Sequence, residues 1–162
     1  MERYSPSQNS SVLFDVTNCS SAEASVLTTL IKIHEDTAPV ILAAGGITLI
    51  WGIVTLILAR GRASGQGGVW MPLRVFRILL SITAALGLVQ AILGGLVWLQ
   101  SPAQGHPAEA LHYVYGGIVL LAIPVAYVYS DQNQVRRDII IMVIAVVAVV
   151  GAAVRAMMTG QP

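Results

Sequence analysis

The chain has 162 residues, of which 56% are hydrophobic and only 10% are charged, and its formal net charge is +1. Soluble domains carry roughly 25% charged residues. This composition, with a mean hydropathy of +0.75, therefore excludes an ordinary water-exposed globule and indicates an integral membrane protein.

The first 28 residues are polar and rich in serine, and we expect them to form an extracytoplasmic tail before a membrane domain of residues 29–162. The run Ser20-Ser21-Ala22-Glu23 matches a capping box, in which a serine and a glutamate satisfy free amide groups at a helix start. It predicts a short amphipathic helix over 21–33 that lies on the membrane. Cys19 is the only cysteine, which excludes an internal disulfide.

Four apolar stretches follow, at about residues 37–59, 75–99, 108–130 and 139–157. Stretches of about 20 residues are long enough to cross a hydrocarbon core of about 30 Å, and without water their backbone groups must pair within helices. Short connections force neighbouring spans to run antiparallel. The expected fold class is therefore all-α, an integral membrane up-down four-helix bundle.

Arginines at the ends of the spans predict the orientation of the bundle. Six of them flank the connections that follow the first and third spans: Arg60, Arg62, Arg74, Arg77, Arg136 and Arg137. The connection between the second and third spans carries no lysine or arginine. Positively charged connections stay in the cytoplasm, so we expect both termini outside. Topology accounts for these charges, and we expect no nucleic-acid partner.

Two of the three histidines, His34 and His112, each stand at the head of an apolar segment. The first and third spans run in the same direction, so both imidazoles should lie at one depth near the outer face. Residues four apart stack on one helical face, which places the small residues Ala38 and Gly116 directly beneath them, if the first helix continues through Pro39. Such clearance suits a flat macrocycle. The pattern predicts that the two imidazoles bind the iron of a haem.

Each of these residues also has an ordinary structural interpretation. A histidine at a membrane interface is often only wetted, and small residues are common where transmembrane helices touch. Arg155, near the outer end of the fourth span, either snorkels to the interface or pairs with a haem propionate, and Lys32 could play the same part. We expect His106 to face solvent in the outer connection and Gln90 to form an interhelical hydrogen bond.

The run Gln-Ala-Ile-Leu-Gly-Gly-Leu-Val at 90–97, followed by Pro107 and then Leu111-His112, resembles the heme A synthase family. In that family a Gln-x-x-Leu-Gly-Gly-like run precedes an outer loop, and a Leu-His pair opens the next span. The likeness covers roughly residues 30–130. It implies one four-helix half of such a protein, with haem b held by His34 and His112.

The chain departs from the family at two places. The catalytic half of the family carries a glutamate three residues before the first histidine, where this chain has Ile31, and Glu35 follows the histidine instead. The outer-loop cysteine pair of some members is also missing. The resemblance therefore implies haem binding more strongly than oxidation of a haem methyl group, and a compact heme A synthase-like oxidoreductase stays open.

We expect a haem-b-binding protein with a redox or haem-handling role in the plasma membrane of a prokaryote. The alternative is a cofactor-free accessory subunit of a larger respiratory or photosynthetic complex, because the branched residues of 143–150 suit packing against partners or lipid equally well. Association of the chain with such a complex, or with a second copy of itself, is compatible with both functions. We disfavour a transporter because we expect no acidic residue inside any span.

Overall fold

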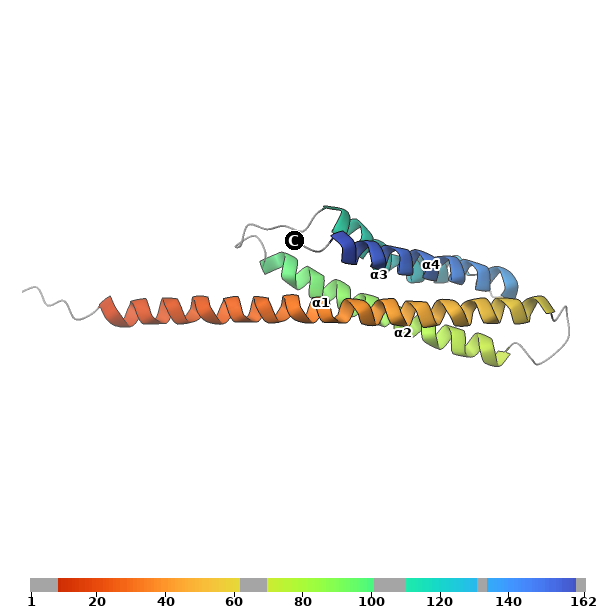
Figure 1. The fold of residues 1–162 in the computed structure, drawn as a ribbon, viewed down its shortest axis with the longest axis horizontal. Helices are drawn as coiled ribbons and strands as arrows, with labels where there is room; N and C mark the ends of the chain where they lie inside the picture. The colour runs from red at the N-terminus through yellow and green to blue at the C-terminus, as the bar shows by residue number, and fades with distance from the viewer. Residues whose placement is uncertain (1–8, 62–69, 101–109, 131–133, 160–162) are drawn as a thin grey trace, which may run out of the picture.

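A computed structural model describes residues 9–61, 70–100, 110–130 and 134–159. Helices account for nearly all of them, and this described part contains no strand. The four helices, shown in Figure 1, are α1 (Asn9–Gly61), α2 (Trp70–Gln100), α3 (Ala110–Val128) and α4 (Val135–Thr159).

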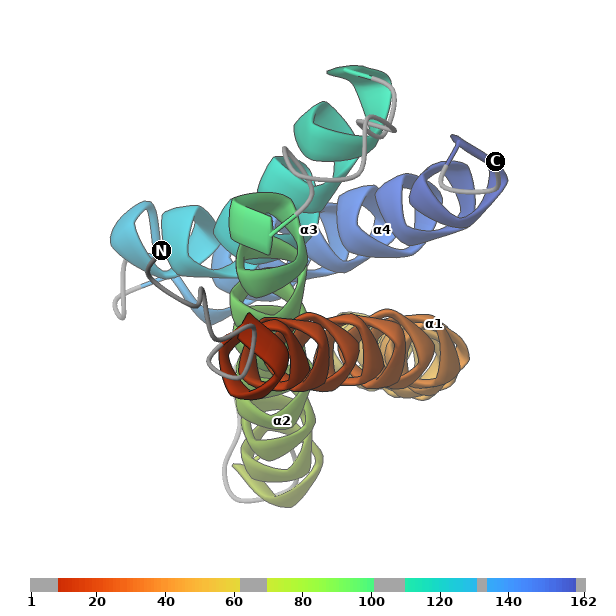
Figure 2. The ribbon, with the colours of Figure 1, turned by 90° about the vertical axis from the view of Figure 1, so that its left-hand side faces the viewer.

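Consecutive helices run in opposite directions, as short connections require. The main contacts join α1 to α2 and α4, and α3 to α4 and α2. The helices α1 and α3 are therefore parallel and lie diagonally across the bundle, in the arrangement expected from the sequence (Figure 2).

All four helices are long and apolar enough to cross a membrane, over Ser25–Arg60, Met71–Leu99, Ala110–Val128 and Val135–Thr159. The prediction of four helices able to span a membrane is confirmed, although several boundaries differ from the expected ones. The third span ends at Val128 rather than at residue 130, because the chain turns there and the Ser130 amide donates to the Tyr127 carbonyl. Residues 108 and 109 of that predicted span lie outside the described residues.

The first helix is longer than predicted. It is a single helix of 53 residues that passes through the expected surface helix at 21–33 and through Pro39 without a break. At 1.5 Å per residue it spans about 80 Å, well beyond a hydrocarbon core of about 30 Å. Its N-terminal part extends past the other three helices in Figure 1. The separate helix predicted at 21–33 is therefore wrong, because the helical hydrogen bonds continue from it into the span.

The core lies where the four helices meet and is built from large apolar side chains matched to small ones. Phe76 on α2 is fully buried, and a Cβ atom added to Gly52 on α1 would lie 2.7 Å from its ring. Thr48 on α1 and Thr83 on α2 share a hydrogen bond of 2.9 Å in the same interface. The remaining large side chains with almost no exposure are Leu80, Ile123, Ile139, Met142, Val146 and Val149.

Three acidic residues lie within the bounds of the candidate spans, contrary to the expectation that none does: Glu35 and Asp36 on α1, and Asp138 on α4. The fourth span begins at Val135, and Asp138 is in its first turn with 2% of its surface exposed. A carboxylate is stabilised at this position by the positive end of the helix dipole. The expected absence of acidic residues from the spans, which disfavoured a transporter, is therefore wrong.

Candidate functional site

The two imidazoles predicted to lie together do so. The ring centres of His34 on α1 and His112 on α3 are 6.2 Å apart, and the ring planes make an angle of 65°. Because α1 and α3 are diagonal in the bundle, these side chains reach towards each other across its interior from parallel helices.

Helical periodicity explains why both histidines face inward. Residues seven and eleven positions after a helical residue lie near the same face. On α1 these positions below His34 are Ile41 and Gly45, and both are buried. On α3 the positions below His112 are Val119 and Ile123, which are also buried. Each imidazole therefore continues the buried face of its own helix.

The chemistry of its partner determines the tautomer of His112. Its Nδ1 atom lies 3.0 Å from the backbone carbonyl oxygen of Ala156 on α4. A carbonyl oxygen only accepts hydrogen bonds, so Nδ1 carries the proton and donates it. In the neutral ring the lone pair is then on Nε2. Histidines that bind metals are commonly oriented by such a hydrogen bond from the second ring nitrogen to a backbone carbonyl.

The imidazole of His34 is held by packing instead. Its Nδ1 atom is buried and has no hydrogen-bond partner among the described residues. A Cβ atom added to Gly94 on α2 would lie 3.2 Å from His34 Cε1, closer than an ordinary contact. The absence of a side chain at Gly94 therefore lets the ring lie against α2. An unpartnered nitrogen is costly to bury unless it binds something.

A polar contact between α1 and α2 fixes the backbone at His34. The Gln90 Nε2 atom donates to the His34 carbonyl oxygen at 2.8 Å, and the Thr37 hydroxyl makes a short hydrogen bond to Gln90 Oε1. The carbonyl can only accept, so the amide nitrogen of Gln90 must face it, and Oε1 must face Thr37. The interhelical hydrogen bond predicted for Gln90 is confirmed, and it ends on the residue that carries the imidazole.

Among the described residues, no hydrogen bond or ring contact joins the other predicted site residues to either imidazole. Gly116 is exposed on α3, and a Cβ atom added there would meet no described atom within 4 Å. Arg155 is exposed on α4, next to the Ala156 whose carbonyl accepts from His112. Lys32 is exposed on α1. His106 lies outside the described residues.

Two participants in the site were not predicted from the sequence. The sequence contained an indication of the contact between Gly94 and His34, because Gly94 belongs to the Gly-Gly pair of the motif at 90–97. The sequence contained no indication of the Ala156 carbonyl. Every residue carries a backbone carbonyl, and only the docking of α4 brings this one to His112.

The donor set limits what the site can bind. Within the described parts of the four helices no group of three or more His, Cys, Asp or Glu side chains could hold a metal ion. Zinc sites in proteins ordinarily use three or four protein ligands. Two imidazoles suit a metal whose other positions are filled by a macrocycle, as in haem, where the protein supplies only axial ligands.

No protein-family model, no curated protein and no solved structure matches this chain.

Proposed function

We propose that this protein binds haem b in the membrane, with His34 and His112 as the two axial ligands of the iron. The observation that supports the proposal most directly is the distance of 6.2 Å between the ring centres. Two imidazoles that bind one metal ion from opposite sides have ring centres roughly 6 Å apart, because each metal–nitrogen bond is about 2.0–2.1 Å.

The surroundings of each ring support the same function. The hydrogen bond to Ala156 leaves Nε2 of His112 with the lone pair that a ligand needs. The buried Nδ1 of His34 has no partner among the described residues. Neither ring is therefore fully used by the contacts that position it. A pair of purely structural histidines would be expected to satisfy its buried nitrogens within the protein.

His34 and His112 would hold the haem, and a haem held by two protein ligands would supply one-electron transfer. This favours an electron-carrying or haem-holding role over catalysis at the iron. The resemblance to the heme A synthase family points to the same cofactor, but the expected catalytic glutamate has no counterpart. Ile31 stands at its position, and Glu35 is exposed on α1. We therefore place oxidation of the haem outside the proposal.

We also propose that the bundle lies in the plasma membrane of a prokaryote with both termini outside. The six arginines near the connections after α1 and α3 support a cytoplasmic location for that end. The two histidines are at the opposite end, where α1 and α3 enter the bundle. The site would then be close to the extracytoplasmic face and open to redox partners on that side.

The absorption spectrum of the detergent-purified protein tests the proposal. We expect a Soret band and, after reduction, the sharp visible band of a six-coordinate low-spin haem. His34→Ala and His112→Ala should each abolish the low-spin spectrum. In titrations of the apoproteins with haemin, both variants should bind haemin more weakly than the wild type. His106→Ala is the matched control, because it removes the third histidine of the chain, and its spectrum should equal that of the wild type.

Three outcomes would contradict the proposal. The first is a colourless protein that does not take up haemin, and the second is a low-spin spectrum that survives in either ligand variant. The third is haem A among the extracted pigments after co-expression with a source of haem O, which would show an enzyme. A colourless protein that migrates with a large membrane complex would favour the accessory subunit instead.

A further inference from the structure

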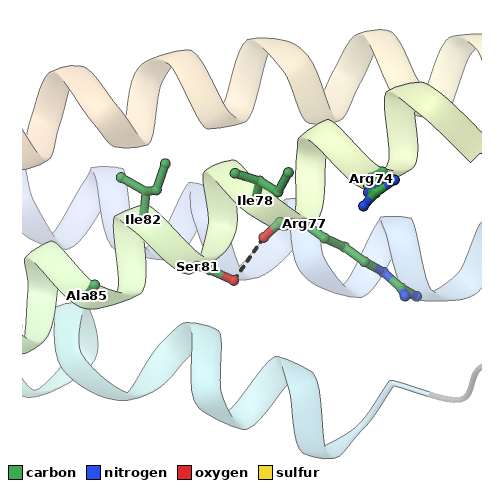
Figure 3. A pocket seen from close by; sticks show the side chains of 6 residues that line it. All are labelled: Arg74, Arg77, Ile78, Ser81, Ile82 and Ala85. Atoms are coloured by element: carbon green, nitrogen blue, oxygen red, sulfur yellow. Dashed lines mark hydrogen bonds between the residues drawn. The ribbon is translucent and has the colours of Figure 1, made fainter.

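A shallow groove of about 420 Å³ lies on one face of α2, far from the histidines (Figure 3). Its lining residues follow helical spacing along a single stripe and are Arg74, Arg77, Ile78, Ser81, Ile82 and Ala85. The groove begins near the start of α2, whereas the contacts of α2 with His34 are made by Gln90 and Gly94 in its second half. The groove and the histidine site are thus separate regions of one helix.

We propose that this groove binds an anionic phospholipid, with the phosphate between Arg74 and Arg77 and an acyl chain along the apolar residues that follow. The proposal does not depend on haem binding. It rests on the juxtaposition of two exposed guanidinium groups with a shallow apolar groove that runs away from them along a candidate membrane-spanning helix.

The charged end of the groove is lined by two arginines and by no acidic residue. Arg74 and Arg77 are one turn apart and exposed, and neither side chain makes an ion pair with a described residue. No carboxylate lines the groove. The hydroxyl of Ser81 donates to the carbonyl of Arg77 at 3.0 Å and is therefore engaged. Guanidinium groups match phosphate oxygens as a fork, so these two arginines are the groups that would hold a phosphate.

The apolar end of the groove explains why the phosphate should belong to a lipid. Ile78 and Ile82 are about half exposed, and Ala85 continues the stripe. From Arg77 to Ala85 the helix rises about 12 Å. Because Met71–Leu99 is a candidate span, a partner that follows this stripe lies at the depth of the acyl chains. Because both charged residues that line the groove are positive, a lipid of net negative charge is favoured over a zwitterionic one.

The experiment compares lipid binding by the purified full-length protein and two double variants. Native mass spectrometry would measure retained phosphatidylglycerol and phosphatidylcholine for the wild type, for Arg74→Gln/Arg77→Gln, and for Arg136→Gln/Arg137→Gln. The last is a matched control, because Arg136 and Arg137 are also exposed arginines at the same end of the bundle, on α4. We expect the wild type to prefer phosphatidylglycerol, and the first variant to bind it about tenfold more weakly.

Two further measurements distinguish lipid binding in the groove from general electrostatic attraction to the arginines. Ile82→Trp, which fills the groove and keeps both arginines, should also reduce retention of phosphatidylglycerol. Glycerol phosphate, which has the phosphate without acyl chains, should not compete. Equal losses in the two arginine variants, no preference of the wild type for the anionic lipid, or full competition by glycerol phosphate would each overturn the proposal. All of the substituted side chains are exposed, so circular dichroism should show unchanged helix content.

Discussion

Two adjacent glycines on α2 have different surroundings, although the sequence presents them as one motif. A Cβ atom at Gly94 would crowd His34 Cε1 at 3.2 Å, whereas one at Gly95 would meet nothing within 4 Å in the described structure. The position of the His34 imidazole therefore depends on Gly94 and not on Gly95. At the residue scale, the orientation of this imidazole is determined by a missing side chain as much as by any hydrogen bond.

This difference gives a matched pair of variants. Gly94→Ala should displace the ring of His34 and weaken haem binding by about tenfold, a typical effect of disturbing the surroundings of a metal ligand. Gly95→Ala should leave haem binding unchanged and provides the control, since both variants add the same methyl group to the same helix. Haemin titration measures the affinities, and equal affinities for the two variants would show that Gly94 does not position His34.

Buried threonines join the first two helices at the element scale. Thr48 on α1 and Thr83 on α2 are both about 1% exposed and bond to each other at 2.9 Å. Each also approaches a carbonyl of its own helix, Ala44 and Leu79 respectively. Because each hydroxyl has this second partner, loss of the interhelical bond should not leave a bare polar group, and its net contribution should be modest.

We expect Thr48→Val and Thr83→Val to show a coupling energy of about 0.6 kcal/mol in a double-mutant cycle, as is typical of hydrogen bonds between membrane helices. The measurement is reversible unfolding in mixed detergent micelles. Thr55→Val is the control, because Thr55 is fully buried but, among the described residues, bonds only to the Trp51 carbonyl of its own helix. It should show no coupling to Thr83. A coupling as large with Thr55 would refute the assignment to the Thr48–Thr83 contact.

At the scale of the whole molecule, the directions of the helices determine which side chains lie at which end of the bundle. Parallel diagonal helices bring their N-terminal ends to one face of the bundle. The histidine pair is at this face, and the arginine-flanked connections are at the other. If the charges orient the bundle as proposed, the histidine pair and the groove on α2 are in opposite leaflets.

Chemical labelling checks this orientation. The chain has one native cysteine, Cys19, which precedes the bundle and should react with a membrane-impermeant maleimide in intact spheroplasts. In the background of Cys19→Ser, Gln66→Cys places a thiol in the connection between α1 and α2, and labelling should require permeabilised membranes. The reverse pattern would place the histidine site at the cytoplasmic face.

Much of this architecture could be predicted from the sequence because it depends on local rules. Four apolar stretches specify four helices, since a membrane leaves the backbone no other partner. Spacing alone placed His34 and His112 on buried faces, because side-chain direction repeats every 3.6 residues. The boundary of α1 could not be predicted from hydropathy, because helical hydrogen bonds extend beyond the hydrocarbon-length segment.

The sequence by itself therefore determined the number of spans, their directions and the faces that carry the two imidazoles. Only the tertiary structure decided that the carbonyl of Ala156 orients His112, that Gly94 accommodates His34, and that the side chain of Arg155 is exposed. These features depend on the rotation and depth of one helix relative to its neighbour. Helix docking sets both quantities through many small contacts, and no periodic pattern in the sequence records their sum.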